Sequence, residues 1–204
     1  MPAGFNYQIN RITDLNFLAH LFLSGDDDDL KIGNYIGDFV KGNQLKKFPE
    51  GIQKGIVMHR RIDEFTDNHP VVLQSKLRLR PKYRHYSPVI VDMFYDHYLA
   101  ANWSDYSSHD LKGYTTGFYK MARLRSDEFP ERVIDLLNHM SATDWLYHYK
   151  EIEGIGRALS GMARRTKFDS GMENSVEDLI EGYDNFLQEF QSFFPELIEY
   201  CNHD

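Results

Sequence analysis

Apolar residues recur at three- and four-residue spacing along almost the whole chain, and this periodicity constrains the fold more than any other feature. Leu15, Leu18 and Phe22, for example, would share one face of a helix. Proline and glycine separate the periodic segments, whereas alternating strand-like runs bounded by hairpin turns are scarce. The sequence therefore predicts an all-α protein that folds as a single-domain helical bundle.

The proline, glycine and polar residues that interrupt this pattern predict where the helices begin and end. We expect helices at about 15–23, 30–40, 49–65, 70–80, 88–103, 108–124, 128–140, 143–150, 155–164 and 175–193. Pro81 and Pro88 are expected to mark boundaries, and Pro195 is expected to begin a terminal turn. The acidic run Asp26–Asp29 is predicted to form a solvated loop, with cation binding as the alternative.

Composition excludes several classes of function. The 204 residues carry a net charge of −8, which argues against a basic nucleic-acid coat. Cys201 is the single cysteine, so an internal disulfide or a cysteine-based zinc site is excluded, and a reducing cytoplasm is expected. We find no stretch of about twenty apolar residues, the length that spans a membrane, and no signal-peptide pattern.

The densest polar cluster lies in the third expected helix. His59, Asp63 and Asp67 are spaced four residues apart and would share one helical face. Imidazole and carboxylate are common ligands of divalent metals, and the adjacent Arg60 and Arg61 are suited to hold phosphate oxygens. The alternative is an exposed helix with ordinary intrahelical ion pairs.

A second cluster interrupts a strongly apolar helix. Asp92 and Asp96 lie one turn apart in a segment whose neighbouring residues, such as Val91 and Phe94, are apolar. His97 directly follows Asp96. Burying an unpaired carboxylate is costly, so these acids are expected to be paired, protonated or metal-bound. This position favours a functional interpretation over a solvated face.

Two further residues complete the candidate metal site. His20 lies inside an apolar run, where a hydrogen-bonded core histidine is the alternative, and Asp38 lies beside an expected helix end, where an acid opposes the helix dipole. This set of three histidines and four acids predicts a site for one or two divalent ions, and its oxygen-rich character favours Mn²⁺ or Mg²⁺. The seven candidates are His20, Asp38, His59, Asp63, Asp92, Asp96 and His97.

Basic residues gather in one segment of this acidic chain. Residues 76–85 contain no acid, and such a patch can steer an acidic partner, although a solvated loop would show the same composition. The candidate docking residues are Lys76, Arg78, Arg80, Lys82 and Arg84. Arg164 and Arg165 could bind phosphate or could be ordinary surface arginines.

Several ordered motifs resemble the bacterial acyl carrier protein phosphodiesterases. The matching stretches are NFLAHL at 16–21, GN at 33–34 with GDFVKGN at 37–43, the segment from Gly55 through MHRRID to TDN at 66–68, the segment from Pro88 through YDHYL to Trp103, and DWL at 144–146 with GMARR at 161–165. The resemblance covers about residues 15–195. It implies one domain over residues 15–204, preceded by an N-terminal extension over residues 1–14.

The resemblance implies an enzyme and its substrate. Members are divergent relatives of the HD-type metal phosphohydrolases, and the bundle is expected to resemble that fold. They use Mn²⁺ or Mg²⁺ to hydrolyse the phosphodiester that joins 4′-phosphopantetheine to a serine of holo-acyl carrier protein, an acidic partner. Two alternatives stay open: a hydrolase of small nucleotides in the same helical class, and a module that binds the carrier protein without cleaving it.

Roles for the candidate residues follow from the resemblance and the residue chemistry together. Metal ligands are expected among Asp38, His59, Asp63, Asp92 and Asp96. Arg60, Arg61 or Lys41 would neutralise charge on the phosphate oxygens. His97 or His20 would protonate the departing serine oxygen.

Overall fold

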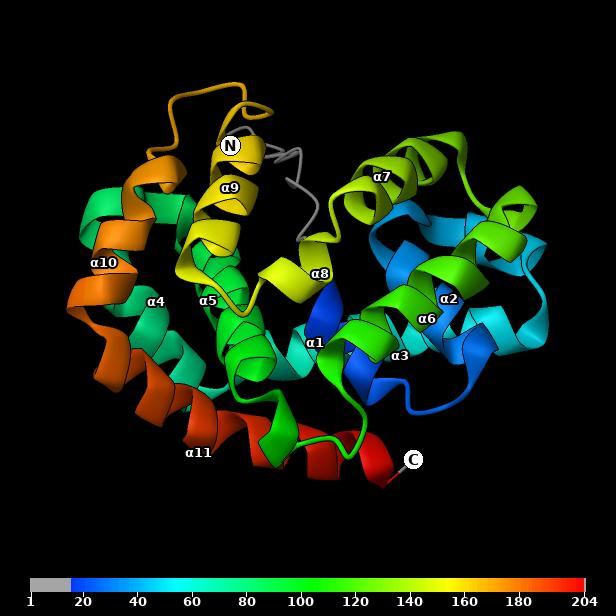
Figure 1. The fold of residues 1–204 in the computed structure, drawn as a ribbon, viewed down its shortest axis with the longest axis horizontal. Helices are drawn as coiled ribbons and strands as arrows, with labels where there is room; N and C mark the ends of the chain where they lie inside the picture. The colour runs from blue at the N-terminus through cyan, green and yellow to red at the C-terminus, as the bar shows by residue number, and fades with distance from the viewer. Residues whose placement is uncertain (1–15, 204) are drawn as a thin grey trace, which may run out of the picture.

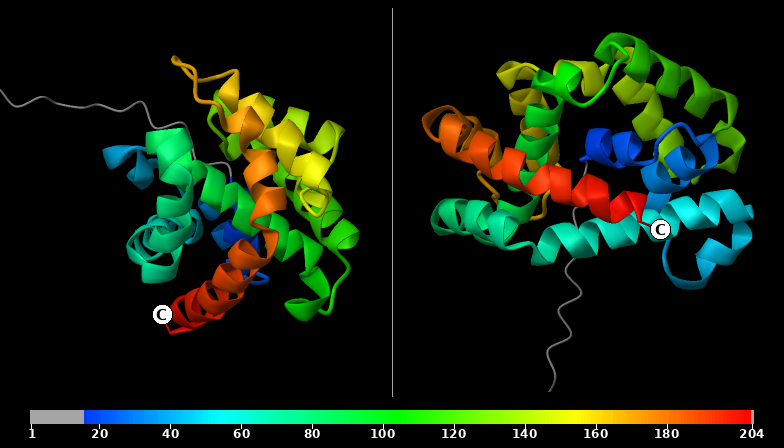
Figure 2. Two further views of the ribbon diagram at one scale, coloured as in Figure 1. Left: turned by 90° about the vertical axis from the view of Figure 1, so that its left-hand side faces the viewer. Right: turned by 90° about the horizontal axis from the view of Figure 1, so that it is seen from below.

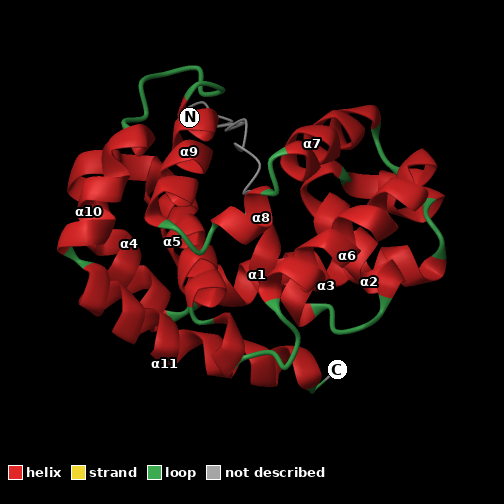
Figure 3. Cartoon of the chain, in the orientation of Figure 1, coloured by secondary structure: helices red, strands yellow, loops and turns green. Residues whose placement is uncertain are grey.

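The computed structural model describes residues 16–203, and over that range the chain is helical, without strands (Figure 3). The all-α prediction is confirmed, whereas the predicted extension at residues 1–14 lies outside the described residues. None of the helices in the described range is both long enough and apolar enough to cross a membrane. The α-helices are α1 (Phe17–Leu23), α2 (Asp28–Ile36), α3 (Glu50–Asn68), α4 (Pro70–Tyr83), α5 (Ser87–Ala101), α6 (Leu111–Leu124), α7 (Glu131–Ala142), α8 (Trp145–His148), α9 (Ile152–Ala163), α10 (Ser175–Glu181) and α11 (Tyr183–Asn202). Two 3₁₀ helices, η1 (Gly37–Phe39) and η2 (Gly42–Lys47), connect α2 to α3.

Helix α1 lies at the centre of the molecule and packs against both α2 and α5 (Figure 1). Helix α11 runs along one side and packs against α3, α4 and α5 (Figure 2). Its four phenylalanines line the core, since none is more than 2% exposed; they are Phe186, Phe190, Phe193 and Phe194. The short, buried α1 is therefore held between two longer helices.

Three predicted boundaries are wrong. Pro81 lies inside α4 and Pro195 lies inside α11, so neither ends its helix. A proline removes one backbone hydrogen bond to the residue four positions earlier, and both of those residues, Leu77 and Gln191, are exposed to water that can replace it. The helix expected over 175–193 is instead two helices, α10 and α11, separated at Gly182.

The acidic run Asp26–Asp29 is not a loop throughout. Asp27 caps α2, because its carboxylate accepts a hydrogen bond from the Leu30 amide at 3.0 Å. Asp28 and Asp29 occupy the first turn, where negative charge favours the helix dipole, and Asp29 pairs with Arg125 at 2.6 Å. The prediction of a solvated loop is therefore wrong for Asp28 and Asp29, which are helical, whereas Asp26 and the capping Asp27 are exposed and precede the helix.

Two glycines bring the backbones of α2 and α3 into direct contact. A Cβ atom on Gly33 would lie 2.2 Å from the Ile52 carbonyl oxygen and 2.7 Å from the Gly55 Cα. A Cβ atom on Gly55 would lie 2.5 Å from the Leu30 carbonyl oxygen. No other residue type fits at this crossing without separating the helices. The contact places the end of α2, together with η1, against the middle of α3.

This crossing predicts a large stability difference between two glycine-to-alanine substitutions. Gly33→Ala forces α2 away from α3 and is expected to lower the free energy of unfolding by about 1–3 kcal/mol or more, the usual cost of overpacking. Urea denaturation followed by circular dichroism measures the change. Gly117→Ala is the control: nothing lies within 4 Å of a Cβ there, and a mid-helix alanine should add roughly 0.5–1 kcal/mol. Equal effects at both positions would contradict the close crossing.

Candidate metal centre

Four polar side chains from three elements converge beside the α2–α3 crossing. His20 comes from α1, Asp38 from η1, and His59 and Asp63 from successive turns of α3. The Nε2 atom of His59 lies 3.3 Å from Asp38 Oδ1 and 3.3 Å from Asp63 Oδ2, and His20 Nε2 lies 3.3 Å from Asp63 Oδ1. The two imidazole rings stack with centroids 4.3 Å apart. We call these four residues the His–Asp cluster.

Local sequence explains how the cluster is assembled. His59 and Asp63 share a face of α3 because they are four residues apart, as the sequence predicts. Gly37 begins η1 against the ring of His59, where a Cβ atom would lie 2.4 Å from the ring carbon Cγ. The absence of a side chain at Gly37 therefore lets Asp38 approach His59.

Burial is uneven across the cluster. His20 and His59 are 1% and 3% exposed, whereas the side chains of Asp38 and Asp63 are 15% and 27% exposed. The histidines thus form the buried base of the cluster, and the carboxylates lie nearer to solvent. Burial by itself lowers the pKa of His59, but the neighbouring Asp38 and Asp63 carboxylates outweigh it, so that its pKa is raised.

Asn34 fixes the orientation and tautomer of His20, a role that we did not predict from the sequence. Its amide nitrogen donates to the His20 carbonyl at 2.9 Å and to Ser24 Oγ at 3.0 Å. Its oxygen, 2.7 Å from His20 Nδ1, must therefore accept a hydrogen bond from that nitrogen. In neutral His20 the lone pair is then on Nε2, which faces the Asp63 carboxylate.

The arrangement satisfies the chemical requirements of a cation site. Among the described residues, ligand atoms of His20, His59 and Asp63 all lie within 4.8 Å of one another. The Nε2 atoms of both histidines and Oδ2 of Asp38 are buried without hydrogen-bond partners. A lone pair that faces a carboxylate is unfavourable unless a positive charge lies between them. Two imidazoles with carboxylate oxygens are also a suitable donor set for a divalent metal.

Asp96 is fully buried next to the cluster, where it binds the start of α1. Its two carboxylate oxygens accept hydrogen bonds from the backbone amides of Leu18 at 3.0 Å and Ala19 at 2.9 Å. Burial raises the pKa of Asp96 to about 7, although these two bonds and nearby His20 act in the opposite direction. Asp96 therefore anchors the helix that carries His20, and its predicted role as a metal ligand stays a prediction.

The other candidates on α5 lie outside the convergent group. Both ring nitrogens of His97 have partners elsewhere: Nδ1 lies 2.8 Å from the Tyr149 carbonyl and Nε2 lies 3.1 Å from the Tyr183 hydroxyl. Burial lowers the pKa of His97. His97 thus joins α5 to the segments that carry these tyrosines. Asp92 is half-buried one turn before Asp96 and is not one of the three residues whose ligand atoms converge.

The predicted phosphate-binding residues have different environments. Arg60 is exposed next to His59 and donates to the Val40 carbonyl at 3.0 Å, and Lys41 follows on the exposed segment after η1. Arg61 is half-buried against α11, where its guanidinium lies 5.0 Å from the centre of the Tyr200 ring. Arg164 and Arg165 are exposed at the end of α9. Among the exposed cationic residues, Arg60 and Lys41 therefore lie closest in sequence to cluster residues, whereas the half-buried Arg61 contacts α11.

The basic segment 76–85 is largely neutralised within the chain. Lys76 pairs with Asp67 at 2.7 Å and Lys82 pairs with Asp178 at 2.6 Å. Arg78 pairs with the buried Glu189. Arg80 and Arg84 are exposed. Three of the five predicted docking residues thus hold the fold together, and docking through this segment stays a prediction.

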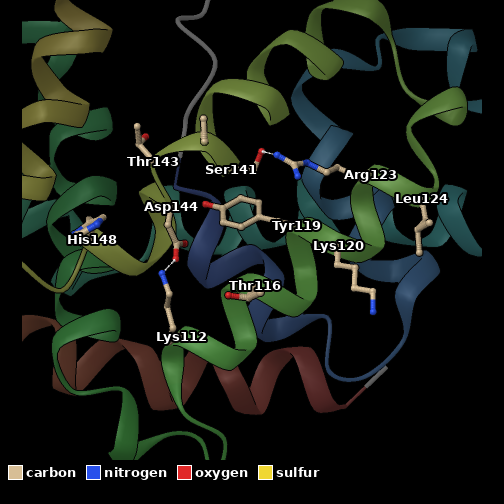
Figure 4. A pocket seen from close by; sticks show the side chains of 11 residues that line it. Lys112, Thr116, Tyr119, Lys120, Arg123, Leu124, Ser141, Thr143, Asp144 and His148 are labelled. Carbon is tan, nitrogen blue, oxygen red and sulfur yellow. Dashed lines mark hydrogen bonds and ion pairs between the residues drawn. The ribbon is translucent and has the colours of Figure 1, made fainter.

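One hollow on the described surface lies away from these residues. It has a volume of about 730 Å³ and lies between α6, α7 and α8 (Figure 4). Arg123 donates to Ser141 across it at 2.7 Å, and Lys112 pairs with Asp144 (Figure 4). None of the predicted site residues lines it. Because two pairs of its polar groups bind each other across the hollow, the His–Asp cluster is the stronger candidate for the functional site.

Comparison with known proteins places the chain in a family. The model for the acyl carrier protein phosphodiesterases matches residues 15–197. The chain belongs to this family. A member from Enterobacter sp. (strain 638), named acyl carrier protein phosphodiesterase, is 34% identical over 185 residues, which are 90% of this chain and 96% of the relative. The protein of the same name from Escherichia coli O6:H1 (strain CFT073) is 34% identical over 186 residues, 91% of this chain and 96% of the relative.

Family membership confirms the resemblance seen in the sequence, and with it the prediction of an enzyme in the class of phosphoric diester hydrolases. No solved structure matches the chain. The likeness to the HD-domain fold stays a prediction. The family match extends over the whole His–Asp cluster, from His20 on α1 to Asp63 on α3.

The anchoring role of Asp96 predicts a specific loss of stability. In Asp96→Asn, the side-chain NH₂ group replaces one of the two acceptor oxygens. One of the two buried backbone N–H groups of α1 therefore loses its acceptor. We expect the free energy of unfolding to fall by about 1–3 kcal/mol. Urea denaturation in EDTA measures it without a contribution from bound metal. Asp105→Asn, at an exposed position, is the control and should stay within about 0.5 kcal/mol of the unsubstituted protein. A similarly small change in Asp96→Asn would show that the two hydrogen bonds are unimportant.

Proposed function

We propose that this chain is a cytoplasmic, metal-dependent hydrolase of holo-acyl carrier protein. It would cleave the phosphodiester between 4′-phosphopantetheine and the carrier serine, giving apo-carrier protein and free 4′-phosphopantetheine. The observation that carries the proposal is the convergence of the buried Nε2 atoms of His20 and His59, which have no hydrogen-bond partner, on the Asp63 carboxylate at 3.3 Å. The names of the family members supply the substrate.

His20, His59 and Asp63 would hold the metal, with Asp38 as a further oxygen donor. A bound Mn²⁺ or Mg²⁺ would lower the pKa of a water molecule and polarise the phosphoryl group. Oxygen donors from two carboxylates favour these ions, although the imidazoles would also accept zinc.

The chain's own residues supply the remaining requirements of the reaction. Water adds to phosphorus, the bond from phosphorus to the serine oxygen breaks, and the serine oxygen gains a proton. Asp38, whose Oδ2 atom has no hydrogen-bond partner, would provide the acceptor oxygen for the proton of the attacking water. Arg60 and Lys41 provide positive charge for the phosphate oxygens.

We infer the proton donor from the hydrogen-bond partners of the candidate residues. His97 has partners on both ring nitrogens outside the cluster, so we do not assign it to proton transfer. His20 belongs to the group that would hold the metal. We therefore propose that the proton taken up from water by Asp38 Oδ2, an oxygen without a hydrogen-bond partner, returns to the serine oxygen.

Intact-protein mass spectrometry tests the proposed function directly. Holo-acyl carrier protein incubated with the enzyme and Mn²⁺ should lose the mass of its prosthetic group, and EDTA should abolish the loss. Turnover of free nucleotides in place of the carrier protein would favour the nucleotide hydrolase. A stable complex with the prosthetic group intact would favour the non-catalytic binding module.

Two neighbouring substitutions on α3 test the assigned residues. Asp63→Asn replaces a carboxylate oxygen of the cluster with an amide nitrogen. It should reduce kcat/KM for holo-acyl carrier protein by about 100-fold or more, which exceeds the usual effect of changing a residue that contacts a metal ligand rather than the metal. Glu64→Gln, at the next and exposed position, is the matched control and should retain full activity. Full activity in a folded Asp63→Asn protein would remove Asp63 from the site.

Asn34 provides a test through metal affinity. Asn34→Ala removes the acceptor that fixes the His20 tautomer. We expect the affinity for Mn²⁺ to fall about 10- to 100-fold, the usual effect of removing a hydrogen-bond partner of a metal ligand. Calorimetric titration or Mn²⁺ electron paramagnetic resonance measures this without turnover. Ser24→Ala removes a second partner of the same amide but leaves the bond to His20. Equal losses in both variants would show that local packing, rather than the tautomer, sets the affinity.

A further inference from the structure

A short basic rim lies next to the His–Asp cluster in the chain. We use this name for residues 40–48, which contain η2 and the exposed lysines Lys41, Lys46 and Lys47. No acidic residue occurs between Asp38 and Glu50. Within residues 16–203, no ion pair involves any of the three lysines. Their positive charge is therefore available to a partner.

The rim is attached firmly to α3, the helix that carries half of the cluster. Arg60 donates to the Val40 carbonyl at one end at 3.0 Å, and Gln53 donates to the Phe48 carbonyl at the other end at 2.7 Å. Between them, η2 packs against α3. The rim thus has a defined position relative to Asp38, which precedes Lys41 by three residues, and to His59, which precedes Arg60.

Apolar surface accompanies the charge. Val57, three residues before Arg60 on α3, is 43% exposed. Protein interfaces combine such apolar contacts with a charged periphery that orients the partner. The rim and the outer face of α3 together have both properties.

The contrast with segment 76–85, where three of the five basic candidates are paired with acids, favours the basic rim. Lys76, Arg78 and Lys82 are paired with acids of the same chain, so binding an acidic partner there would require breaking those pairs. The rim lysines have no such competition. In a chain with a net charge of −8, an unpaired basic surface next to the candidate site is unusual and attracts negative charge selectively.

From these observations we infer that the basic rim docks a carboxylate-rich face of the protein substrate, so that its phosphodiester enters the His–Asp cluster. The inference rests on the proposed function, since it assumes that the substrate is a protein. Docking is the role of Lys46 and Lys47, which lie further along the chain from the cluster than Lys41.

Charge reversal tests the docking surface. In the double variant Lys46→Glu/Lys47→Glu, we expect KM for holo-acyl carrier protein to rise at least about 10-fold with kcat nearly unchanged, because ground-state and transition-state binding are weakened equally. The salt sensitivity of kcat/KM should also fall. Lys120→Glu/Lys167→Glu carries the same change of charge at two exposed lysines on α6 and in the loop after α9. This control should behave like the unsubstituted protein.

A binding measurement separates failure of docking from failure of the proposed function. Fluorescence anisotropy of labelled holo-acyl carrier protein reports affinity whether or not the bond is cleaved. Selective loss of affinity in Lys46→Glu/Lys47→Glu supports docking through the basic rim. If the unsubstituted protein binds the carrier protein but shows no turnover, the proposed reaction is wrong and the docking proposal still stands. Unchanged affinity in that variant overturns the docking proposal, as does selective loss of affinity in Arg80→Glu/Arg84→Glu, which would locate docking on segment 76–85. Unsubstituted protein that neither binds nor cleaves the carrier protein overturns both proposals.

Discussion

The close contact of α2 with α3 is the constraint on which the candidate site depends. Gly33 and Gly55 allow two backbones to meet where any side chain would separate them. The contact brings Asn34 and η1 against the middle of α3, so that Asp38 reaches His59. Gly37 extends the same principle, because its lack of a side chain admits the His59 ring. The glycines therefore determine the geometry of a site to which they contribute no ligand.

The electrostatics of the cluster follow from this geometry. Asn34 holds His20 so that a lone pair faces the Asp63 carboxylate, and His59 lies between two carboxylates. Such an arrangement concentrates acceptor atoms around two buried imidazoles, which is unfavourable unless a positive charge lies between them. Asp96 supports the same arrangement, because its carboxylate accepts hydrogen bonds from two backbone amides at the start of α1 and thereby positions His20. A site of this kind requires buried polar groups that are held by the fold rather than by the ion alone.

Periodicity was sufficient to predict the helices and the pairing of His59 with Asp63, because both depend on spacing within one helix. It was insufficient for Asp96 and His97. The sequence shows both as polar residues on an apolar helix, but only the neighbouring elements decide that Asp96 binds the amides of α1 and that His97 binds Tyr149 and Tyr183. The basic segment 76–85 illustrates the same limit: its charges are obvious in the sequence, whereas the acids that neutralise them are up to about a hundred residues away.

The sequence by itself determined the all-α class, the family and most of the polar residues that form the cluster, because helical spacing and ordered motifs are local properties. The tertiary structure decided which of those residues meet, that Asn34 orients His20, and that unpaired positive charge remains on Lys46 and Lys47 rather than on Lys76. The physical reason is that hydrogen bonds and ion pairs between distant segments depend on how helices cross. At this site that crossing is set by two glycines whose significance becomes apparent only when the two backbones are seen in contact.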